Sequence, residues 1–420
     1  MTTASPTTGV MSFEDARHLV EQHAGLVSPG EAETAEILSA YGRVLAETIA
    51  ADRDFPPFSR ATRDGYAVRA QDVAQVPTSL QVIGEIKAGG AHDPAFNIQP
   101  GQAASIMTGA PLPHGADAVV MVEYTSQAGN SVEIQRSVKT GENFVPRGAE
   151  ACQGQTLLEK GTRIDHAAIA ITASVGKDNL QVFRKPRIVV LATGDEIVEI
   201  GQAPGPAQIR NSNTYSLAAQ IQNAGGEPVL LPIAPDERVR LKALIEEGLK
   251  SDLLLLAGGV SMGKYDLVEQ VLAELNAEFY FTGAQIQPGR PVVFGRGGRN
   301  RTEVSDPQET YFFGLPGNPV STMVTFELFV RPMIQALSGG KPQPIIFLKA
   351  RLKSEVRAKT GLKRFLPAVF SGEFENVEVE LAHWQGSGDI AALAGSNCYL
   401  VIPPDREQIA AGEWVSLLMR

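Results

Sequence analysis

The strongest candidate for chemistry is the stretch Asp252–Asp266, which reads DLLLLAGGVSMGKYD. Its apolar run Leu253–Ala257 is typical of a strand buried on both faces. Gly258 and Gly259 end that run, and apolar positions with helical spacing begin at Leu267. A strand, a glycine loop and a helix in this order place backbone N–H groups against a phosphate or another oxyanion. Alone, the stretch fits an ordinary crossover loop equally well, because glycine loops are common.

Carboxylates flank this stretch, and two further segments also follow predicted strands. The stretch ends in carboxylates, Asp252 and Asp266, which could hold a hard cation such as Mg²⁺ beside a bound anion. TGDE at Thr193–Glu196 and GLPGNP at Gly314–Pro319 also follow predicted strands. Because parallel strands end at one edge of a sheet, we expect all three segments to face one crevice. Together they predict a site for a phosphate-bearing anion, with a divalent cation held by Glu196, Asp252 or Asp266.

The elements that position these segments alternate between strand and helix from Pro186 onward, which predicts a doubly wound α/β domain. The predicted strands are 188–192, 229–233, 253–257 and 311–314, and the predicted helices include 214–223 and 236–250. A helix after Asn318-Pro319 should run to about Leu337 and be kinked or interrupted at Pro332.

The rest of the chain predicts three other regions. A capping box at Ser12 predicts a first helix to Ala24, and apolar spacing predicts a second helix over 31–50. Between residues 76 and 145 the chain reads as short strands, a small β-module, with an Asp64-Gly65 turn before it. After the linker at 338–342 come short strands without a long helix, which predicts a second all-β domain.

Bulk composition limits the class of protein. With 420 residues the chain should form two to four domains, and 43% hydrophobic and 20% charged residues are typical of a globular protein. A net charge of −10 argues against a nucleic-acid partner. Two cysteines without a CxxC pair predict neither a disulfide framework nor a structural zinc site and fit the cytoplasm. No apolar run approaches the roughly 20 residues needed to cross a bilayer, so no membrane partner is expected.

Other common enzyme signatures are missing from the sequence. It contains no G-x-G-x-x-G, no P-loop, no H-E-x-x-H and no G-x-S-x-G. Dinucleotide oxidoreductases, P-loop NTPases, zinc proteases and α/β-hydrolases are therefore not indicated.

Five motifs, taken in order, resemble a known family. RDGYAVRA, MTGAPLPHGADAVV, LATGDEIVEIG, AGGVSMGKYD and FGLPGNPVSTMVTF together are similar to the molybdopterin molybdenumtransferases (MoeA), which are related to the E domain of gephyrin. The resemblance covers nearly the whole chain after the first ten residues. It implies a multidomain fold, α/β plus all-β, in four parts. These are a discontinuous helical linker domain at 11–55 and 150–185, a small β-module at 56–149, a MoaB/Mog-like α/β domain at 186–338, and a C-terminal β-barrel-like domain at 343–420.

The resemblance also implies an activity. Members of the family insert molybdenum from molybdate into adenylylated molybdopterin, with Mg²⁺-dependent release of AMP, during molybdenum cofactor biosynthesis. It implies a cytoplasmic homodimer with an active site shared between subunits, and contacts with other proteins of the same biosynthesis. Two alternatives remain open from the sequence: a molybdopterin adenylyltransferase, which needs only the α/β domain, and a gephyrin-like scaffold without catalysis.

Site residues follow from the matched motifs. The acids implied to be catalytic are Asp64, Glu196, Asp252 and Asp266, of which the last three would hold the metal. Residues implied to bind substrate are Thr108, Gly258, Gly259, Ser261, Arg290, Pro316, Gly317, Asn318, Pro319 and Ser387.

The sequence departs from the family pattern at three places. Gln287 and Arg290 stand where many members have lysines, and Arg suits a bidentate oxyanion contact better than Lys. Ala149-Glu150 replaces the common Glu-Asp pair. The expected Arg directly after Gly361 is missing, which leaves Lys363 or Arg364 as its substitute.

Overall fold

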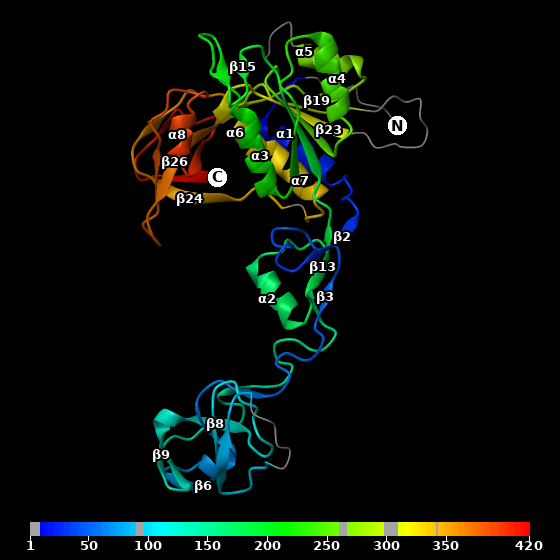
Figure 1. The fold of residues 1–420 in the computed structure, drawn as a ribbon. Helices are drawn as coiled ribbons and strands as arrows, with labels where there is room; N and C mark the ends of the chain where they lie inside the picture. The colour runs from blue at the N-terminus through cyan, green and yellow to red at the C-terminus, as the bar shows by residue number, and fades with distance from the viewer. Residues whose placement is uncertain (1–8, 90–95, 260–266, 298–309, 342) are drawn as a thin grey trace, which may run out of the picture.

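The structure is a computed structural model that describes residues 9–89, 96–259, 267–297, 310–341 and 343–420. The molecule is elongated (Figure 1). An α/β domain and a C-terminal barrel lie side by side at one end, a small β-module lies at the other end, and a slender linker domain joins them. The predicted fold class, α/β plus all-β in several domains, is confirmed.

The α/β domain is built on a six-stranded sheet in the order β17-β14-β18-β23-β22-β19. The first four strands are parallel, and β22 and β19 are antiparallel. Their bounds are β14 Arg187–Ala192, β17 Glu227–Leu230, β18 Leu253–Ala257, β19 Glu278–Phe281, β22 Val293–Gly297 and β23 Thr310–Leu315. The four parallel strands overlap the four predicted from the apolar runs, although β17 both begins and ends earlier than the predicted range.

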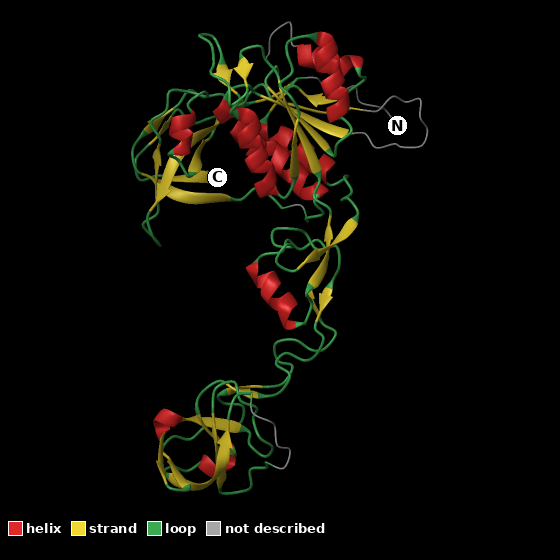
Figure 2. Cartoon of the chain, in the orientation of Figure 1, coloured by secondary structure: helices red, strands yellow, loops and turns green. Residues whose placement is uncertain are grey.

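Helices cover both faces of this sheet (Figure 2). Side chains of β18 alternate between the two faces: Leu253 and Leu255 join one apolar cluster, and Leu254 and Leu256 join another. The first cluster packs under α1, α3, α6 and α7, and the second under α4 and α5. The bounds are α1 Phe13–Ala24, α3 Asn213–Ala224, α4 Arg238–Gly248, α5 Leu267–Glu274, α6 Pro319–Thr325 and α7 Arg331–Leu337. The predicted cap of α1 forms, since the Ser12 side chain accepts a bond from the Asp15 N–H.

The predicted interruption near Pro332 is confirmed. A π-helical turn, Phe326–Val330, separates α6 from α7, and Pro332 is the second residue of α7. Proline has no N–H to donate to the residue four positions earlier, so the regular ladder cannot continue through it.

The C-terminal domain is a closed barrel of five strands, because β26 pairs with both β27 and β28. The strands are β24 Phe347–Leu352, β26 Lys363–Ser371, β27 Glu378–Leu381, β28 Cys398–Ile402 and β30 Trp414–Met419, and a short helix is α8 Ile390–Ala394. A small ribbon pairs β25 Val356–Arg357 with β29 Gln408–Ile409.

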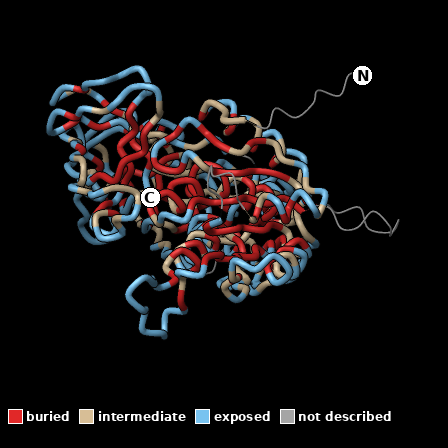
Figure 3. Tube along the Cα trace, turned by 90° about the horizontal axis from the view of Figure 1, so that it is seen from above, coloured by how far each residue is buried: buried red, intermediate tan, exposed pale blue. Residues whose placement is uncertain are grey.

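The barrel and the α/β domain share one apolar core, which is visible as buried chain in Figure 3. Phe13 of α1 packs against Phe329 and against Phe365 of the barrel, with ring centroids 6.1 and 5.2 Å apart. In addition, β21 (Ile286–Gln287) runs beside β26 with Gln287 opposite Arg364. Any cleft between these two domains therefore has walls fixed to a common core. α1, which we predicted to belong to the linker domain, packs into this core.

The linker domain corrects one prediction. The expected helix over 31–50 is wrong: the chain forms β2 (Ala32–Glu36), a series of turns, and β3 (Ile49–Ala50). β2 pairs with β13 (Asn179–Phe183), and β3 with β12 (Thr156–Leu158). Both partners lie more than a hundred residues later, so local spacing could not reveal them. The linker domain does contain a helix, α2 (His166–Ser174), between β12 and β13.

The small β-module is a six-stranded sheet in the order β8-β5-β7-β6-β10-β9. Its strands are β5 Gly65–Val68, β6 Thr78–Ile86, β7 Gln102–Ile106, β8 Ala118–Met121, β9 Thr125–Ala128 and β10 Ser131–Ile134. Two short strands at its entrance, β4 Arg60–Ala61 and β11 Phe144–Val145, pair with each other. In the described part of the chain, none of the helices has the length and apolar character to span a lipid bilayer.

Candidate active site

The three predicted strand ends meet at one edge of the sheet. The register pairs Ala192 of β14 with Ala257 of β18, and Ala257 with Leu315 of β23. The next residues, Thr193, Gly258 and Pro316, therefore leave the sheet at the same level. This confirms the expectation that TGDE, AGG and GLPGNP face one crevice.

A cleft of about 930 Å³ lies at this edge, between the α/β domain and the barrel. Its size falls within the range of small-molecule sites. The predicted residues among those that line it are Glu196, Gly258, Arg290, Pro316, Gly317, Asn318, Pro319 and Ser387. The barrel contributes Lys359, Arg364, Trp384 and Ser387, so the cleft needs both domains.

Glycine is required at the loop that follows β18. Gly258 and Gly259 have φ of 92° and 67°, where side chains are strained. A Cβ at Gly258 would lie 2.9 Å from the carbonyl oxygen of Thr193, and one at Gly259 would lie 2.5 Å from Oγ1 of Thr193. Bare backbone therefore forms this part of the wall.

The turn before α6 is fastened to both neighbouring elements. Asn213 Nδ2 donates to the Gly317 carbonyl at 2.7 Å, and Asn318 Nδ2 donates to Ser387 Oγ at 2.9 Å. The Ser387 carbonyl accepts the Val320 N–H at 3.0 Å. Asn318 stands at the N-cap position, but its side chain reaches Ser387 and makes no cap bond, so the backbone of Ser387 takes over part of that role.

Positive charge dominates the cleft. Of the described residues that line it, Arg210, Arg290, Lys359 and Arg364 are basic and Glu196 alone is acidic. Arg364 is only 8% exposed, and its Nη1 donates to the Leu362 carbonyl at 3.1 Å. Burial lowers the pKa of its guanidinium, which nevertheless stays protonated near neutral pH. Among the described residues no carboxylate pairs with Arg290 or Arg364, an arrangement that favours a bound anion.

The structure decides between Lys363 and Arg364. Lys363 pairs with Glu14, and its ammonium lies 4.9 Å from the ring centre of Phe13. Adjacent residues of a strand point to opposite faces, and Arg364 is the one that lines the cleft. Of the two candidates to substitute for the Arg missing after Gly361, Arg364 is therefore the one that lies in the cleft.

Negative charge gathers at the end of β14 beside the cleft. Burial, followed by the charges of Asp195 and Glu196, raises the pKa of Asp236. The Asp236 N–H donates to Asp195 Oδ1 at 3.1 Å. Crowded carboxylates of this kind are stabilised by a nearby cation. Gly194, with φ of 136°, lets Glu196 fold back, since a Cβ there would lie 2.4 Å from Glu196 Oε2.

Asp252 is not at this edge. It precedes β18 and so lies at the amino end of the strand whose carboxyl end carries Gly258. There it accepts two bonds from Arg184, at 2.8 and 3.0 Å, and the Arg187 N–H at 2.7 Å. The five residues of β18 separate it from the cleft by roughly 17 Å at the rise of a strand. The expectation that Asp252 joins Glu196 around one metal ion is therefore corrected: Asp252 holds the linker domain to the sheet.

Asp64 and Thr108 lie together in the small β-module. Gly65 of β5 is paired with Ile106 of β7, which brings Asp64 beside the loop after β7. Asp64 Oδ1 accepts the Thr108 N–H at 2.6 Å and the Thr108 hydroxyl at 2.8 Å. These bonds, the backbone one first, lower the pKa of the Asp64 carboxyl. Within one chain this pair lies far from the cleft, at the opposite end of the molecule (Figure 1).

Some predicted residues lie outside the described residues, and some cleft residues were not predicted. Ser261 and Asp266 fall in 260–266, which the structure does not describe. Asn213, Arg210 and Lys359 line the cleft without having been predicted. The polar run Arg210–Asn213 before a helix was a usable signal for the first two. Lys359 stands in a loop of the barrel and had no local signal.

Asn213 adds a different kind of group to the cleft. Its side chain is buried, with 8% of the residue exposed, and its Oδ1 has no hydrogen-bond partner among the residues that the structure describes. It is thus an acceptor among many donors, available to an N–H or O–H group of a ligand. Within the described ranges, no three His, Cys, Asp or Glu side chains are grouped closely enough to hold a metal ion by themselves.

Comparison with known proteins defines the class. Three family models match in order: the MoeA N-terminal region (domain I and II) over residues 11–176, a probable molybdopterin binding domain over 189–336, and the MoeA C-terminal region (domain IV) over 349–419. A crystal structure of a molybdopterin biosynthesis MoeA protein from Pyrococcus horikoshii is similar with a TM-score of 0.77 and 28% identity, covering 98% of this chain and all of that one. The protein is thus a member of the MoeA class of folds.

Full-length relatives place it more closely. A molybdopterin molybdenumtransferase of Nostoc is 35% identical over 98% of this chain and 94% of its own length. One of Bacillus subtilis is 33% identical over 93% of this chain and 90% of its own. The chain belongs to the molybdopterin molybdenumtransferase family.

Proposed function

We propose that this protein inserts molybdenum from molybdate into adenylylated molybdopterin, releasing AMP, as a step of molybdenum cofactor biosynthesis. The observation that carries the proposal is the pair Arg290 and Arg364, two guanidinium groups in a cleft with no carboxylate partner among the described residues. Guanidinium groups bind tetrahedral oxyanions in bidentate fashion. Molybdate and the phosphates of an adenylylated substrate are both such anions.

The two walls of the cleft suggest a division of the substrates. Arg364, Lys359 and the Ser387 hydroxyl supply donors on the barrel side, and Arg290 of the α/β domain adds another, which suits molybdate. Gly258 lines the sheet side of the cleft without a side chain, so a phosphate can approach the backbone there closely. Binding both anions side by side would hold the oxyanion against the adenylylated end of the substrate, and positioning of this kind contributes strongly to rate.

Mg²⁺ fits this cleft as a partly protein-bound ion. It is usually held by one or two carboxylates with water and substrate phosphates. Glu196 supplies one carboxylate in the cleft, and the acids Asp195 and Asp236 lie near it. Asp266 would be a second ligand. When bound, Mg²⁺ would offset the charge of the phosphates and make AMP a better leaving group.

Asp64 would complete the site from a second subunit. Its carboxylate stays ionised because Thr108 donates two hydrogen bonds to it. Its own chain cannot bring it to the cleft, since the linker domain holds the small β-module at the far end of the molecule (Figure 1). In a homodimer, the small β-module of each subunit would lie over the cleft of the other subunit. Asp64 and Thr108 of one chain would then face the cleft of its partner. There a fixed carboxylate can orient the attacking group or accept its proton.

The setting proposed for this reaction is the cytoplasm, alongside other proteins of cofactor biosynthesis. Cys152 and Cys398 are both free thiols, which agrees with a reducing compartment.

Reconstitution tests the proposal. Purified protein, adenylylated molybdopterin, Mg²⁺ and molybdate should release AMP in a molybdate-dependent manner. Adenylylated product formed from ATP and molybdopterin would instead identify an adenylyltransferase, and no reaction in either assay would favour a scaffold.

A mixing experiment tests the shared site. Asp64→Ala and Glu196→Ala homodimers should each be inactive, and a heterodimer of the two keeps one intact site. Recovery of roughly half of wild-type activity per dimer is expected. No recovery in heterodimers of verified composition would overturn the arrangement in trans.

A further inference from the structure

A second pocket, of about 400 Å³, lies where the linker domain meets the α/β domain. We call it the junction pocket. The linker domain contributes Gly42–Val44, Gly161–Arg163 and Phe183–Lys185, and the ends of α3 and α7 contribute Ala224, Gly225, Gln335 and Ser338. It shares no lining residue with the cleft. Arg184, which lines it, pairs with Asp252 at the amino edge of the sheet, opposite the cleft.

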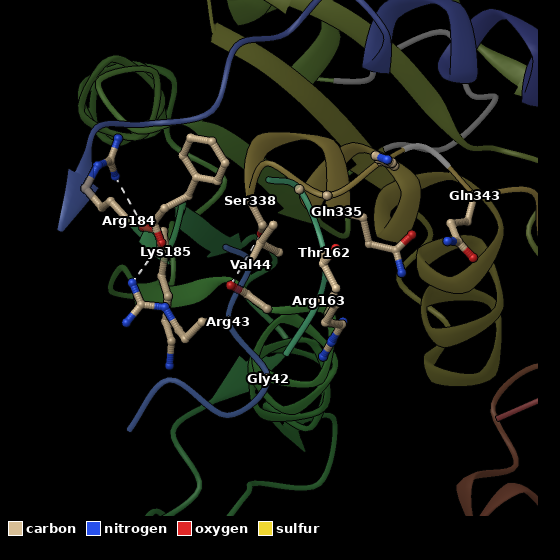
Figure 4. A pocket seen from close by; sticks show the side chains of 16 residues that line it. Gly42, Arg43, Val44, Thr162, Arg163, Arg184, Lys185, Gln335, Ser338 and Gln343 are labelled. Carbon is tan, nitrogen blue, oxygen red and sulfur yellow. Dashed lines mark hydrogen bonds between the residues drawn. The ribbon is translucent and has the colours of Figure 1, made fainter. Parts of the chain in front are cut away.

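All charged side chains that line the junction pocket are basic: Arg43, Arg163, Arg184, Lys185 and Lys341. In Figure 4, Arg43, Arg184 and Lys185 lie on one side of the pocket, Gln335 and Gln343 lie on the other, and Arg163 lies between them. Like charges gathered around one cavity repel one another, and a bound anion would offset that repulsion.

Three of the five basic groups have acidic partners outside the pocket wall. Arg43 pairs with Glu33 and also donates to the Phe183 carbonyl at 2.8 Å. Arg184 pairs with Asp252, and Lys341 with Glu159. Because of these three ion pairs, Arg43, Arg184 and Lys341 do not need an anionic ligand.

Arg163 and Lys185 are different. Arg163 donates one bond, to the Asn223 carbonyl at 3.0 Å, which satisfies the end of α3 and leaves its other N–H groups available. The Lys185 ammonium makes no bond within the part of the chain that the structure describes. Because neither has an acidic partner there, the pocket keeps a local excess of positive charge in a protein whose net charge is −10.

The wall leaves room for a ligand to approach the backbone. Gly42, Gly161 and Gly225 line the pocket with φ of 76°, 89° and 101°, so no side chain fills these places. Phe183, Val44 and Ala224 supply an apolar surface beside the charges. A cavity with an apolar wall and a few convergent charges is typical of small-molecule sites.

We propose that the junction pocket binds the phosphate group of a small molecule, with Arg163 and Lys185 as its principal ligands. Since the pocket has one wall on the linker domain and one on the α/β domain, a bound phosphate links the two domains. Binding would favour the orientation of the linker domain relative to the α/β domain in which both walls contact the phosphate.

Phosphate binding by titration calorimetry tests the proposal. The cleft also binds anions, so the measurements use the full-length Arg290→Ala/Arg364→Ala variant, in which the cleft has lost two guanidinium groups. Inorganic phosphate should still bind this variant. Adding Arg163→Ala/Lys185→Ala should weaken binding about tenfold or more, the usual effect of losing charge-assisted bonds.

A matched control removes the same charge elsewhere. Arg240 and Lys242 stand on α4, on the other face of the sheet. Arg240→Ala/Lys242→Ala in the same background should change phosphate affinity by less than about twofold. The charge-conserving Arg163→Lys/Lys185→Arg variant should keep most of the affinity, which separates loss of binding from loss of folding.

Two results would overturn the proposal, and two others would identify the ligand. Absence of phosphate binding in the background variant, or equal weakening by the α4 control, would overturn the proposal. AMP that binds more tightly than inorganic phosphate, and whose binding Arg163→Ala/Lys185→Ala weakens, identifies a phosphate ester as the ligand. Tighter binding of inorganic phosphate, weakened in the same way, identifies the free ion. Both of these support the site.

Discussion

The two edges of the central sheet carry similar charged residues with opposite roles. At the carboxyl edge, Arg290 and Arg364 face the cleft with no carboxylate partner among the described residues. At the amino edge, Arg184 is bound by both oxygens of Asp252. A charged side chain with an ion-pair partner can hold two domains together, whereas one without a partner in a cleft is available to bind a ligand. The pairing of a charged group, more than its presence in a motif, therefore indicates its role.

The sharpest test of this comparison removes the charge of one acid at each edge, in two separate variants. Glu196→Gln should lower kcat for AMP release by about 10²- to 10³-fold, because it removes a carboxylate from the proposed metal site. Asp252→Asn should leave kcat near the wild-type value. It should instead lower the free energy of unfolding by about 1–2 kcal/mol, since Arg184 loses its charged partner. Kinetics and urea denaturation of both variants give the answer, and the reverse pattern would put the metal at the amino edge.

Arg364→Ala should lower kcat/KM for molybdate by about 10²-fold, because the cleft loses a buried guanidinium. The neighbouring Lys363→Ala removes the same charge from the opposite side of the strand, where Lys363 pairs with Glu14. It should change kcat/KM less than about twofold. Equal losses in both variants would mean that charge near the barrel, and not a contact in the cleft, matters.

Gly194→Ala should lower activity about tenfold, because a Cβ there meets Glu196 Oε2 and displaces it. Gly201 lies in the same connection, and a Cβ at this position would meet nothing within 4 Å. Gly201→Ala should therefore behave as wild type. The prediction fails if Gly194→Ala keeps full kcat with an unchanged thermal midpoint.

The smallest effect concerns Asp64 and is a change in pH dependence. Bonds from Thr108 lower the pKa of the Asp64 carboxyl, so activity that needs the carboxylate is lost only when pH falls through this lowered pKa. Thr108→Val removes the hydroxyl bond and should raise the pKa, so the acid limb of the rate profile moves to higher pH. Thr108→Ser keeps a hydroxyl and should keep the wild-type profile. An unchanged profile in Thr108→Val would leave Asp64 without a role in the titrating step.

Much of the α/β domain was predictable because its signals are local. The run Leu253–Ala257 predicted a central strand, because buried parallel strands are uniformly apolar. Gly258-Gly259 predicted its end, because a tight turn out of the sheet needs glycine. The linker domain was not predictable in this way. Residues 31–50 have apolar spacing like that of a helix, but Leu38 and Tyr41 are exposed and the segment pairs with strands far along the chain.

By itself the sequence determined which residue types follow each strand, and hence predicted an oxyanion site with glycine backbone and an acid at the end of the sheet. Only the tertiary structure decided which charges meet there. It moved Asp252 to the opposite edge, because a residue before a strand and a residue after it are separated by the strand's full length. It selected Arg364 over Lys363, because adjacent residues on a strand face opposite ways. It also placed Asp64 in the small β-module, at the opposite end of an elongated molecule from the cleft of its own chain.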